Sequence, residues 1–278
     1  MVEDYLSHCC QTENAALFPL FESMRYSLLG GGKRIRPFLV LEVAEMLGAT
    51  KESALPYAAA LEMIHTYSLI HDDLPAMDND DYRRGRLTCH KKFGEATAIL
   101  AGDGLLTHAF YIATQGGDPL KNAEAVRVLA ECAGPFGMVG GQALDLASEG
   151  KKIDFKTLES IHRLKTGKLI RAAVTLGAIA ATATKKDIDA LLSYADGIGQ
   201  VFQLIDDVLD RFGDTSKLGK TTGKDEKSGK NTYLTFYTKE EALAYAEELT
   251  EKAVLLVSPC DKKRVLKAFA YYMLVRQN

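Results

Sequence analysis

The chain has 278 residues, of which 47% are hydrophobic, 26% are charged and only 7 are proline. This composition excludes a disordered or fibrous protein and favours a globular chain that buries a sizeable core. Its 34 Lys and Arg against 37 Asp and Glu give a net charge of −3, which argues against a nucleic-acid partner. We expect any anion binding to be local.

The first ten residues, MVEDYLSHCC, carry acid where a signal peptide carries base, and no run of about eighteen apolar residues follows. We therefore expect no membrane span. The 5 cysteines form neither a disulfide framework nor a CxxC metal site, which favours a reducing compartment. The prediction is a cytoplasmic protein.

Helical apolar periodicity dominates the chain, and its stretches are rich in Ala, Leu, Glu and Lys. These features predict an all-α protein, a single domain over residues 1–278 built as a bundle of about ten or more helices around a central cavity. The expected helices span residues 13–33, 37–48, 53–73, 94–115, 119–132, 136–148, 154–166, 168–182, 185–212 and 239–276, the last with a break near Pro259. Three segments rich in charge and turn residues, 30–32, 74–92 and 214–230, are expected to be loops, where function concentrates.

The strongest chemical signal is IHDDLPAMDNDD, followed at once by YRRGR. A solvated helix end is the ordinary explanation of a charge run. Here Asp72 and Asp73 follow an apolar stretch, so their carboxylates come from the core side and a metal site is favoured. On a continuous helix Asp78 would lie about 120° from the face of Asp72. Pro75 disfavours helical geometry just before it, so we expect a break that returns Asp78 toward the metal.

A second acidic cluster, QLIDDVLD, lies within another apolar stretch. Asp206 and Asp210 are one turn apart and about 40° apart around a helix, and Gln203 is a turn before Asp207. Carboxylates on such a face are costly to bury without a partner, so a cation is favoured. Oxygen ligands with no Cys or His at ligand spacing indicate Mg²⁺, with Mn²⁺ as the alternative.

Three weaker signals concern phosphate binding. The run GGGKRIRP places Lys33 and Arg36 between a glycine loop and a helix, but it is not a Walker A loop. His65 lies about 20° short of two helical turns before Asp72, although a lone histidine is more often structural. KTGK at residues 165–168 fits either a plain helix or a phosphate clamp at a helix break. No nucleophile arrangement is visible, so the residues alone indicate a helical bundle for hydrophobic substrates that carry diphosphate.

With these motifs in place, the chain resembles the trans-prenyltransferases, most closely the bacterial farnesyl diphosphate synthase type. The resemblance runs from GGGKRIRP through HTYSLIHDDLPAMDNDDYRRGR, GMVGGQALDL and HRLKTGKLI to GQVFQLIDDVLD and LGKTTGKDEKSGKNTY. It implies a homodimeric helical bundle of the isoprenoid synthase type, with three Mg²⁺ ions in each active site. Two rivals are a terpene cyclase, whose second motif differs, and a non-catalytic prenyl synthase subunit, which lacks intact aspartate motifs.

The resemblance also implies residue roles. The metal ligands would be Asp72, Asp73, Asp78, Asp206, Asp207 and Asp210. Isopentenyl diphosphate would bind Lys33, Arg36, His65 and Arg84. The allylic diphosphate would bind Arg83, Lys165, Thr166, Gln203, Lys220 and Lys230. The catalytic set would be Asp72, Asp73, Asp78, Arg83, Lys165, Asp206 and Lys220.

The expected product is (2E,6E)-farnesyl diphosphate, formed by ionisation, condensation and elimination from isopentenyl diphosphate and dimethylallyl or geranyl diphosphate. Helix arithmetic selects Ser68 as the floor for the growing tail, since it lies about 40° from the face of Asp72. The family resemblance instead selects Tyr67, where a bulky aromatic favours a fifteen-carbon product. Geranylgeranyl or geranyl diphosphate is the alternative product, and a core aromatic without a role in chain length is the alternative reading of Tyr67.

Overall fold

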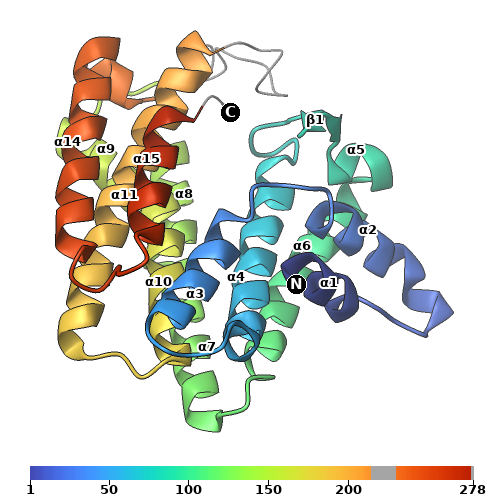
Figure 1. Cartoon of the computed structure of the whole chain (residues 1–278). Helices are drawn as coiled ribbons and strands as arrows, with labels where there is room; N and C mark the ends of the chain where they lie inside the picture. The colour runs from blue at the N-terminus through green and yellow to red at the C-terminus, as the bar shows by residue number, and fades with distance from the viewer. Residues whose placement is uncertain (214–229, 277–278) are drawn as a thin grey trace.

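The computed structural model describes residues 1–213 and 230–276. The described chain forms a helical bundle with one short antiparallel hairpin (Figure 1). In chain order the elements are α1 (Val2–Cys9), η1 (Ala15–Leu17), α2 (Phe18–Leu28), α3 (Ile35–Met46), α4 (Lys51–Asp72), β1 (Tyr82–Arg83), β2 (Arg86–Leu87), α5 (Cys89–Phe93), α6 (Glu95–Ala113), α7 (Pro119–Ala133), α8 (Met138–Ser148), α9 (Phe155–His162), η2 (Arg163–Gly167), α10 (Lys168–Ala180), α11 (Lys185–Phe212), η3 (Tyr233–Thr235), α14 (Lys239–Val257) and α15 (Val265–Val275). The prediction of an all-α bundle is confirmed.

The predicted helices from residue 37 onward match observed ones, and the break near Pro259 separates α14 from α15. The prediction of one helix over 13–33 is wrong at both ends. The Asn14 side chain caps a short 3₁₀ turn, Pro19 stands in the first turn of α2, and α2 ends at Leu28. Helices α1 and α5 and the hairpin were not predicted, because each is too short to show a clear period.

Helix α4 is the centre of the bundle. Every residue from Ala54 to Ile64 is buried, which explains why this stretch lacks an amphipathic pattern. It packs against α3, α6 and α10, and α10 also packs against α11. The Thr50 side chain accepts a hydrogen bond from the Ser53 amide and fixes where α4 begins.

Helix α6 is the one helix among residues 1–213 and 230–276 whose length and composition would allow it to cross a membrane. It packs against α4 along one side, and 39% of its apolar window is buried. These two facts place it among the core helices of the bundle, with part of its apolar surface uncovered.

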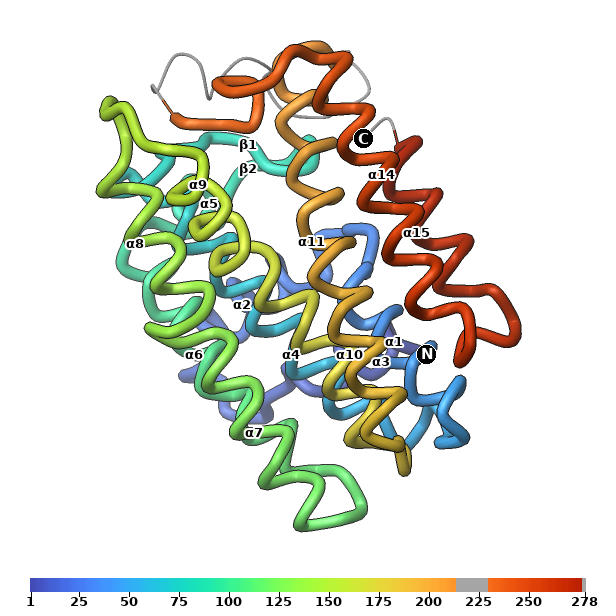
Figure 2. Tube along the Cα trace, turned by 90° about the vertical axis from the view of Figure 1, so that its left-hand side faces the viewer, coloured from blue at the N-terminus to red at the C-terminus, as the bar shows by residue number. Residues whose placement is uncertain are grey.

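The helix ends that carry the two acidic motifs lie at the same end of the bundle. Figure 2 shows the β1–β2 hairpin, the last turns of α11 and the end of α15 gathered at the top of the molecule. Helix α4 runs toward this same end in Figure 1, so its last residue, Asp72, lies there too. The fold therefore carries both acidic motifs to one end.

Candidate functional site

The first acidic motif begins where α4 stops. Helix α4 ends at Asp72, and the chain then turns so that the Asp78 amide donates to the Asp72 carbonyl at 2.9 Å. The Asp80 amide closes a second turn onto the Asp73 carbonyl at 3.2 Å. The expected break before Pro75 is confirmed, and it brings Asp78 back to the Asp72 backbone.

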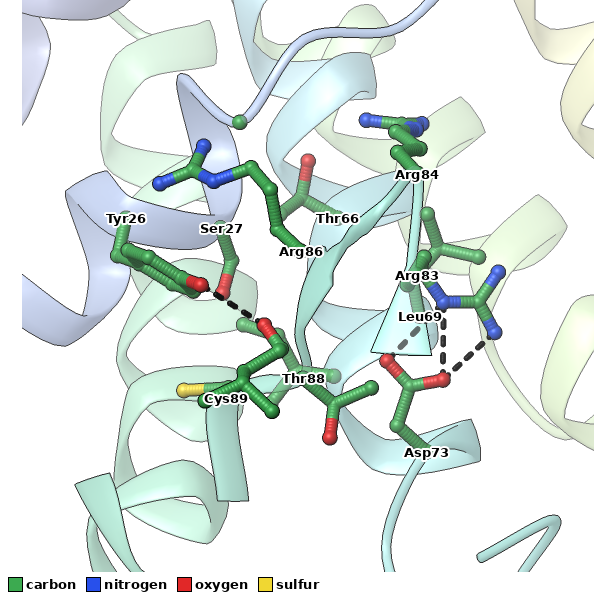
Figure 3. A pocket seen from close by; sticks show the side chains of 13 residues that line it. Tyr26, Ser27, Thr66, Leu69, Asp73, Arg83, Arg84, Arg86, Thr88 and Cys89 are labelled. Carbon is green, nitrogen blue, oxygen red and sulfur yellow. Dashed lines mark hydrogen bonds and ion pairs between the residues drawn. The ribbon is translucent and has the colours of Figure 1, made fainter. Parts of the chain in front are cut away.

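Asp73 is held by an arginine of the hairpin. Arg83 Nε lies 2.9 and 3.0 Å from the two carboxylate oxygens of Asp73, and Arg83 Nη2 lies 2.7 Å from Oδ1 (Figure 3). The Asp73 side chain is only 4% exposed. Such a forked contact fixes both groups at one geometry.

The hairpin turn makes two adjacent arginines diverge. Arg84 and Gly85 have φ of 54° and 73°, the pair of positive values that a tight two-residue hairpin turn requires. Arg84 therefore points away from Asp73 and donates to the carbonyl of Gly31. The Gly32 φ is 135°, and a Cβ there would lie 2.8 Å from the Arg84 guanidinium, so only glycine fits.

The loop between α2 and α3, residues 29–34, is the basic loop, and it lies beside this hairpin. Lys33 is exposed at its tip, and α3 begins at Ile35, two residues earlier than predicted. Arg36 Nε is buried and makes no hydrogen bond with residues 1–213 or 230–276. Burial, with Arg36 and Arg84 nearby, holds the pKa of His65 well below its ordinary value, so this imidazole is neutral at pH 7. The structure thus gathers the four residues predicted for isopentenyl diphosphate.

The second acidic motif lies on α11 with partners from three elements. Gln203 Nε2 donates to Asp207 Oδ1 at 2.8 Å, and the Tyr233 amide donates to Asp207 Oδ2 at 2.7 Å. Asp206 Oδ1 accepts from Arg276 Nη2 at 2.6 Å. Asp207 and Asp210 are buried, so the helix delivers its carboxylates from within the bundle.

A π-helical segment, η2, presents the KTGK motif. The helix is irregular at this motif, since a wider π-helical turn lies between α9 and α10, so the motif is not part of a plain α-helix. Such turns are frequent at functional sites. Lys165 Nζ donates to Asp145 Oδ2 at 2.7 Å, and Thr166 Oγ1 donates to Gln203 Oε1 at 3.1 Å. Thr166 and Gln203, predicted to share one ligand, therefore touch each other.

Two further lysines, Lys220 and Lys230, were predicted to bind the allylic diphosphate. Lys230 Nζ donates to Asp78 Oδ1 at 2.9 Å, across 152 residues of sequence. Lys220 lies outside the described residues.

Burial raises the pKa of Asp72 to about 6, and Asp78 and Asp73 add to the rise while Lys165 opposes it. The Asp72 side chain makes no hydrogen bond or ion pair with the described part of the chain. Loss of water is thus the main reason that the Asp72 carboxylate is unfavourable, and the nearby Lys165 and Arg83 offset part of that cost.

The donor set fits a hard divalent cation, since Asp72 and Asp78 offer oxygen ligands close enough to repel each other. Over residues 1–213 and 230–276, however, no three acidic, His or Cys side chains are gathered as a ready metal site. Asp73, Asp78 and Asp206 each face a protein cation instead. A bound ion would therefore draw these carboxylates away from their present partners.

Sequence reasoning missed four residues that support this site. Asp145 holds Lys165, Glu62 holds Arg34 of the basic loop, Arg276 holds Asp206, and the Tyr233 backbone holds Asp207. Charged residues at otherwise apolar helical positions were the available signal for Asp145 and Glu62. No local signal marks Arg276 or Tyr233, because each reaches its partner only through the fold.

The family model for polyprenyl synthetase matches residues 19–272. The chain belongs to the polyprenyl synthetase family. A geranylgeranyl diphosphate synthase of Cyanophora paradoxa is 50% identical over 287 residues, covering 100% of this chain and 94% of the relative. A farnesyl diphosphate synthase of Escherichia coli is 50% identical over 240 residues, covering 84% and 80%.

A solved geranyltransferase of Helicobacter pylori, complexed with magnesium and isoprenyl diphosphate, shares the fold. Its TM-score is 0.87 at 32% identity, and the match covers 99% of this chain and 92% of that chain. The chain is accordingly a trans-prenyltransferase of the chain-elongating polyprenyl synthetase family, which uses Mg²⁺ and isoprenyl diphosphates.

Proposed function

We propose that this polyprenyl synthetase condenses isopentenyl diphosphate with dimethylallyl or geranyl diphosphate to form (2E,6E)-farnesyl diphosphate. The observation that carries the proposal is the convergence of two acidic motifs and two basic groups at one end of the bundle. The first basic group comprises Lys33, Arg36 in the first turn of α3 and Arg84 of the hairpin, and the second is η2 with Lys165. Two diphosphates need two such positive sites.

The two arginines of the hairpin divide these sites. Arg84, His65, Arg36 and Lys33 are the proposed ligands of isopentenyl diphosphate. The proposed ligands of the allylic diphosphate are Arg83, Lys165, Thr166, Gln203, Lys220 and Lys230. Arg83 supports this division because its contact with Asp73 turns it toward the acidic motif, while Arg84 faces the glycine loop.

The proposed metal ligands are Asp72, Asp73, Asp78, Asp206, Asp207 and Asp210. When bound, Mg²⁺ supplies positive charge that balances the charge developing on the departing diphosphate. Lys165 and Arg83 add fixed positive charge at the same place, and their own ion pairs keep them oriented before substrate arrives.

No protein nucleophile is required. The allylic carbon–oxygen bond breaks, the double bond of isopentenyl diphosphate attacks the resulting allylic cation, and a proton leaves to the released diphosphate. The chain's own part is to hold the two diphosphates, align the carbons and exclude water.

The fifteen-carbon product is proposed from Tyr67. Its side chain is 5% exposed, and its ring meets the His71 ring edge-on at 5.7 Å between centroids. His71 in turn fills the space at Gly102 of α6, where an added Cβ would lie 2.1 Å from His71 Nε2. Ser68 instead donates to the His65 carbonyl of its own helix at 2.8 Å. This packing supports Tyr67 over Ser68 as the wall that stops the growing tail.

Product length is tested by replacing that wall. Tyr67→Ala should shift the product from farnesyl to geranylgeranyl diphosphate, because it opens volume beside His71, and Tyr67→Phe should leave the product unchanged. Ser68→Ala is the matched control from the next position on α4. Farnesyl diphosphate as the sole product of an active Tyr67→Ala enzyme would assign the stop to another residue.

The activity itself is tested with purified protein, Mg²⁺, isopentenyl diphosphate and either dimethylallyl or geranyl diphosphate, with product length read by chromatography. Elongated diphosphates support the proposal. A cyclised hydrocarbon would indicate a terpene cyclase, and no product from any starter would indicate a non-catalytic subunit.

The uncovered side of α6 supports the homodimer. Ile99, Leu100 and Tyr111 are 44%, 58% and 59% exposed on a helix apolar enough for a core. A second copy of the chain is the proposed cover, since exposed apolar surface on this scale marks association sites. Light scattering should give a dimer for the wild type and a monomer for Leu100→Glu.

Two further predictions belong with this proposal. The family match from residue 19 to 272 supports one domain over residues 1–278. The cytoplasmic location stays a prediction, because two relatives, of Arabidopsis thaliana and Catharanthus roseus, are named as chloroplastic. Fractionation of the source cells tests it.

A further inference from the structure

Glu62 is a carboxylate in the apolar middle of α4, and its side chain is 3% exposed. It stands one helical turn before His65, on the side of α4 that faces the basic loop. An unpaired carboxylate at this depth would be strongly unfavourable. Its ion-pair partner is Arg34, whose Nη1 lies 2.7 Å from Glu62 Oε1.

Arg34 ties the basic loop to three other parts of the chain. Its Nε and Nη2 donate to Glu3 of α1 at 2.6 and 3.2 Å, Nη2 also donates to the Leu28 carbonyl at 2.7 Å, and Nη1 reaches Glu62. Its backbone is left-handed, with φ of 49°, immediately before α3. A non-glycine residue holds such a conformation only where its surroundings fix it, and functional sites collect such residues.

Arg36 stands two residues after this anchor. Its buried Nε has no hydrogen-bond partner in residues 1–213 and 230–276, and Glu62, Asp206 and Arg84 all act on its charge. A buried guanidinium group with an unused donor is costly unless a ligand satisfies it. Arg34 is the N-cap residue of α3, and Arg36 lies in the first turn of that helix, so the contacts of Arg34 bear on the position of Arg36.

We infer that Glu62 is a positioning residue for isopentenyl diphosphate: it holds Arg34, and Arg34 holds the loop so that Lys33 and Arg36 meet the diphosphate. This inference rests on the proposed function. Glu62 itself touches neither the reacting atoms nor the substrate, so its effect passes through the loop.

The direction in which Glu62→Gln changes diphosphate binding distinguishes a positioning role from a purely electrostatic one. Glu62→Gln removes a negative charge near an anion site, and by charge alone it should tighten diphosphate binding. If Glu62 positions the loop, the same substitution should weaken diphosphate binding by about tenfold or more, because a charge-assisted contact is lost.

The experiment measures isopentenyl diphosphate affinity by isothermal titration, and KM and kcat with geranyl diphosphate saturating. Glu62→Gln should raise the dissociation constant and the KM for isopentenyl diphosphate while kcat and the KM for geranyl diphosphate change less than about twofold. Glu3→Gln is the matched control, because it removes the outer, exposed partner of the same arginine, and it should leave all four quantities within about twofold.

Arg34→Lys is the second variant. It keeps the positive charge but loses the planar guanidinium group, so it should weaken isopentenyl diphosphate binding as Glu62→Gln does. If Glu62→Gln does not fold, Arg34→Lys provides the test of the inference. Unchanged or tighter binding of isopentenyl diphosphate in the folded variant overturns the inference. A wild type that neither binds nor turns over isopentenyl diphosphate overturns the proposed function and this inference with it.

Discussion

Arg83→Ala and Arg84→Ala should differ in stability as well as in kinetics, although the two residues are neighbours on one hairpin. Arg83 makes three contacts of 2.7 to 3.0 Å with Asp73, whose side chain is 4% exposed. Removing one partner of a buried pair typically destabilises by about 3–5 kcal/mol. The Arg83 side chain is 33% exposed, so we reduce this figure to about 2 kcal/mol for solvent screening.

Arg84 is exposed, and its contact with the Gly31 carbonyl involves no buried charge. Its loss should change stability by less than about 1 kcal/mol. In differential scanning fluorimetry, the melting temperature of Arg83→Ala should fall by about 3–4 °C and that of Arg84→Ala by less than about 2 °C. Arg83→Lys should recover part of the Arg83→Ala loss, because it keeps the charge without the fork.

Steady-state kinetics complete this comparison. Arg84→Ala should raise the KM for isopentenyl diphosphate by about tenfold to a hundredfold, and Arg83→Ala should act mainly on the allylic substrate. The reasoning is refuted if the two variants give the same kinetic profile, or if Arg84→Ala melts as early as Arg83→Ala.

Three further outcomes are expected. Asp72→Ala should lower turnover by about a thousandfold or more with circular dichroism unchanged, Asp206→Ala should lower it similarly, and EDTA should silence the wild type; retained activity would contradict the metal assignment. Arg276→Met should lower the melting temperature, and adding Asp206→Asn should restore part of it because no charge is then left unpaired; additive losses would contradict the pair. Burial lowers the pKa of His162 to about 4, so the unfolded chain binds the extra proton below pH 6.5, and stability should fall by about 3 kcal/mol between pH 6.5 and 4 in urea titrations. His162→Phe should lack this fall, and an equal fall in the variant would assign it elsewhere.

Most helices were predictable because each buries one stripe or is buried all round, and either pattern is local in sequence. The errors fall where local preference is weak. Helix α1 has only 8 residues, so its apolar positions Val2, Tyr5, Leu6 and Cys9 span barely two turns, too few to establish a helical period. The hairpin depends on a left-handed Arg84, which sequence alone does not favour.

The site was predictable at the level of which residues converge, and less so at the level of what each one contacts. The helix break before Pro75, which returns the Asp78 backbone to Asp72, was predictable because the restriction that a proline places on the preceding residue is local. The pairs Arg276–Asp206 and Lys230–Asp78 join residues 70 and 152 positions apart, so only the fold brings them together.

Protein cations already balance part of the acidic charge at this site. Buried carboxylates were taken to need a metal cation, yet Arg83, Lys230 and Arg276 already supply positive charge to three of the aspartates. Burial of acid is therefore not by itself an argument for Mg²⁺ in this fold. Asp72 differs from these three aspartates, because it is desolvated and forms no direct ion pair within residues 1–213 and 230–276, although Lys165 and Arg83 lie near enough to offset the repulsion from Asp78 and Asp73. Protein cations that neutralise its neighbours allow the acidic motifs to fold before metal arrives, and Asp72 is left as the position where a divalent ion gains most.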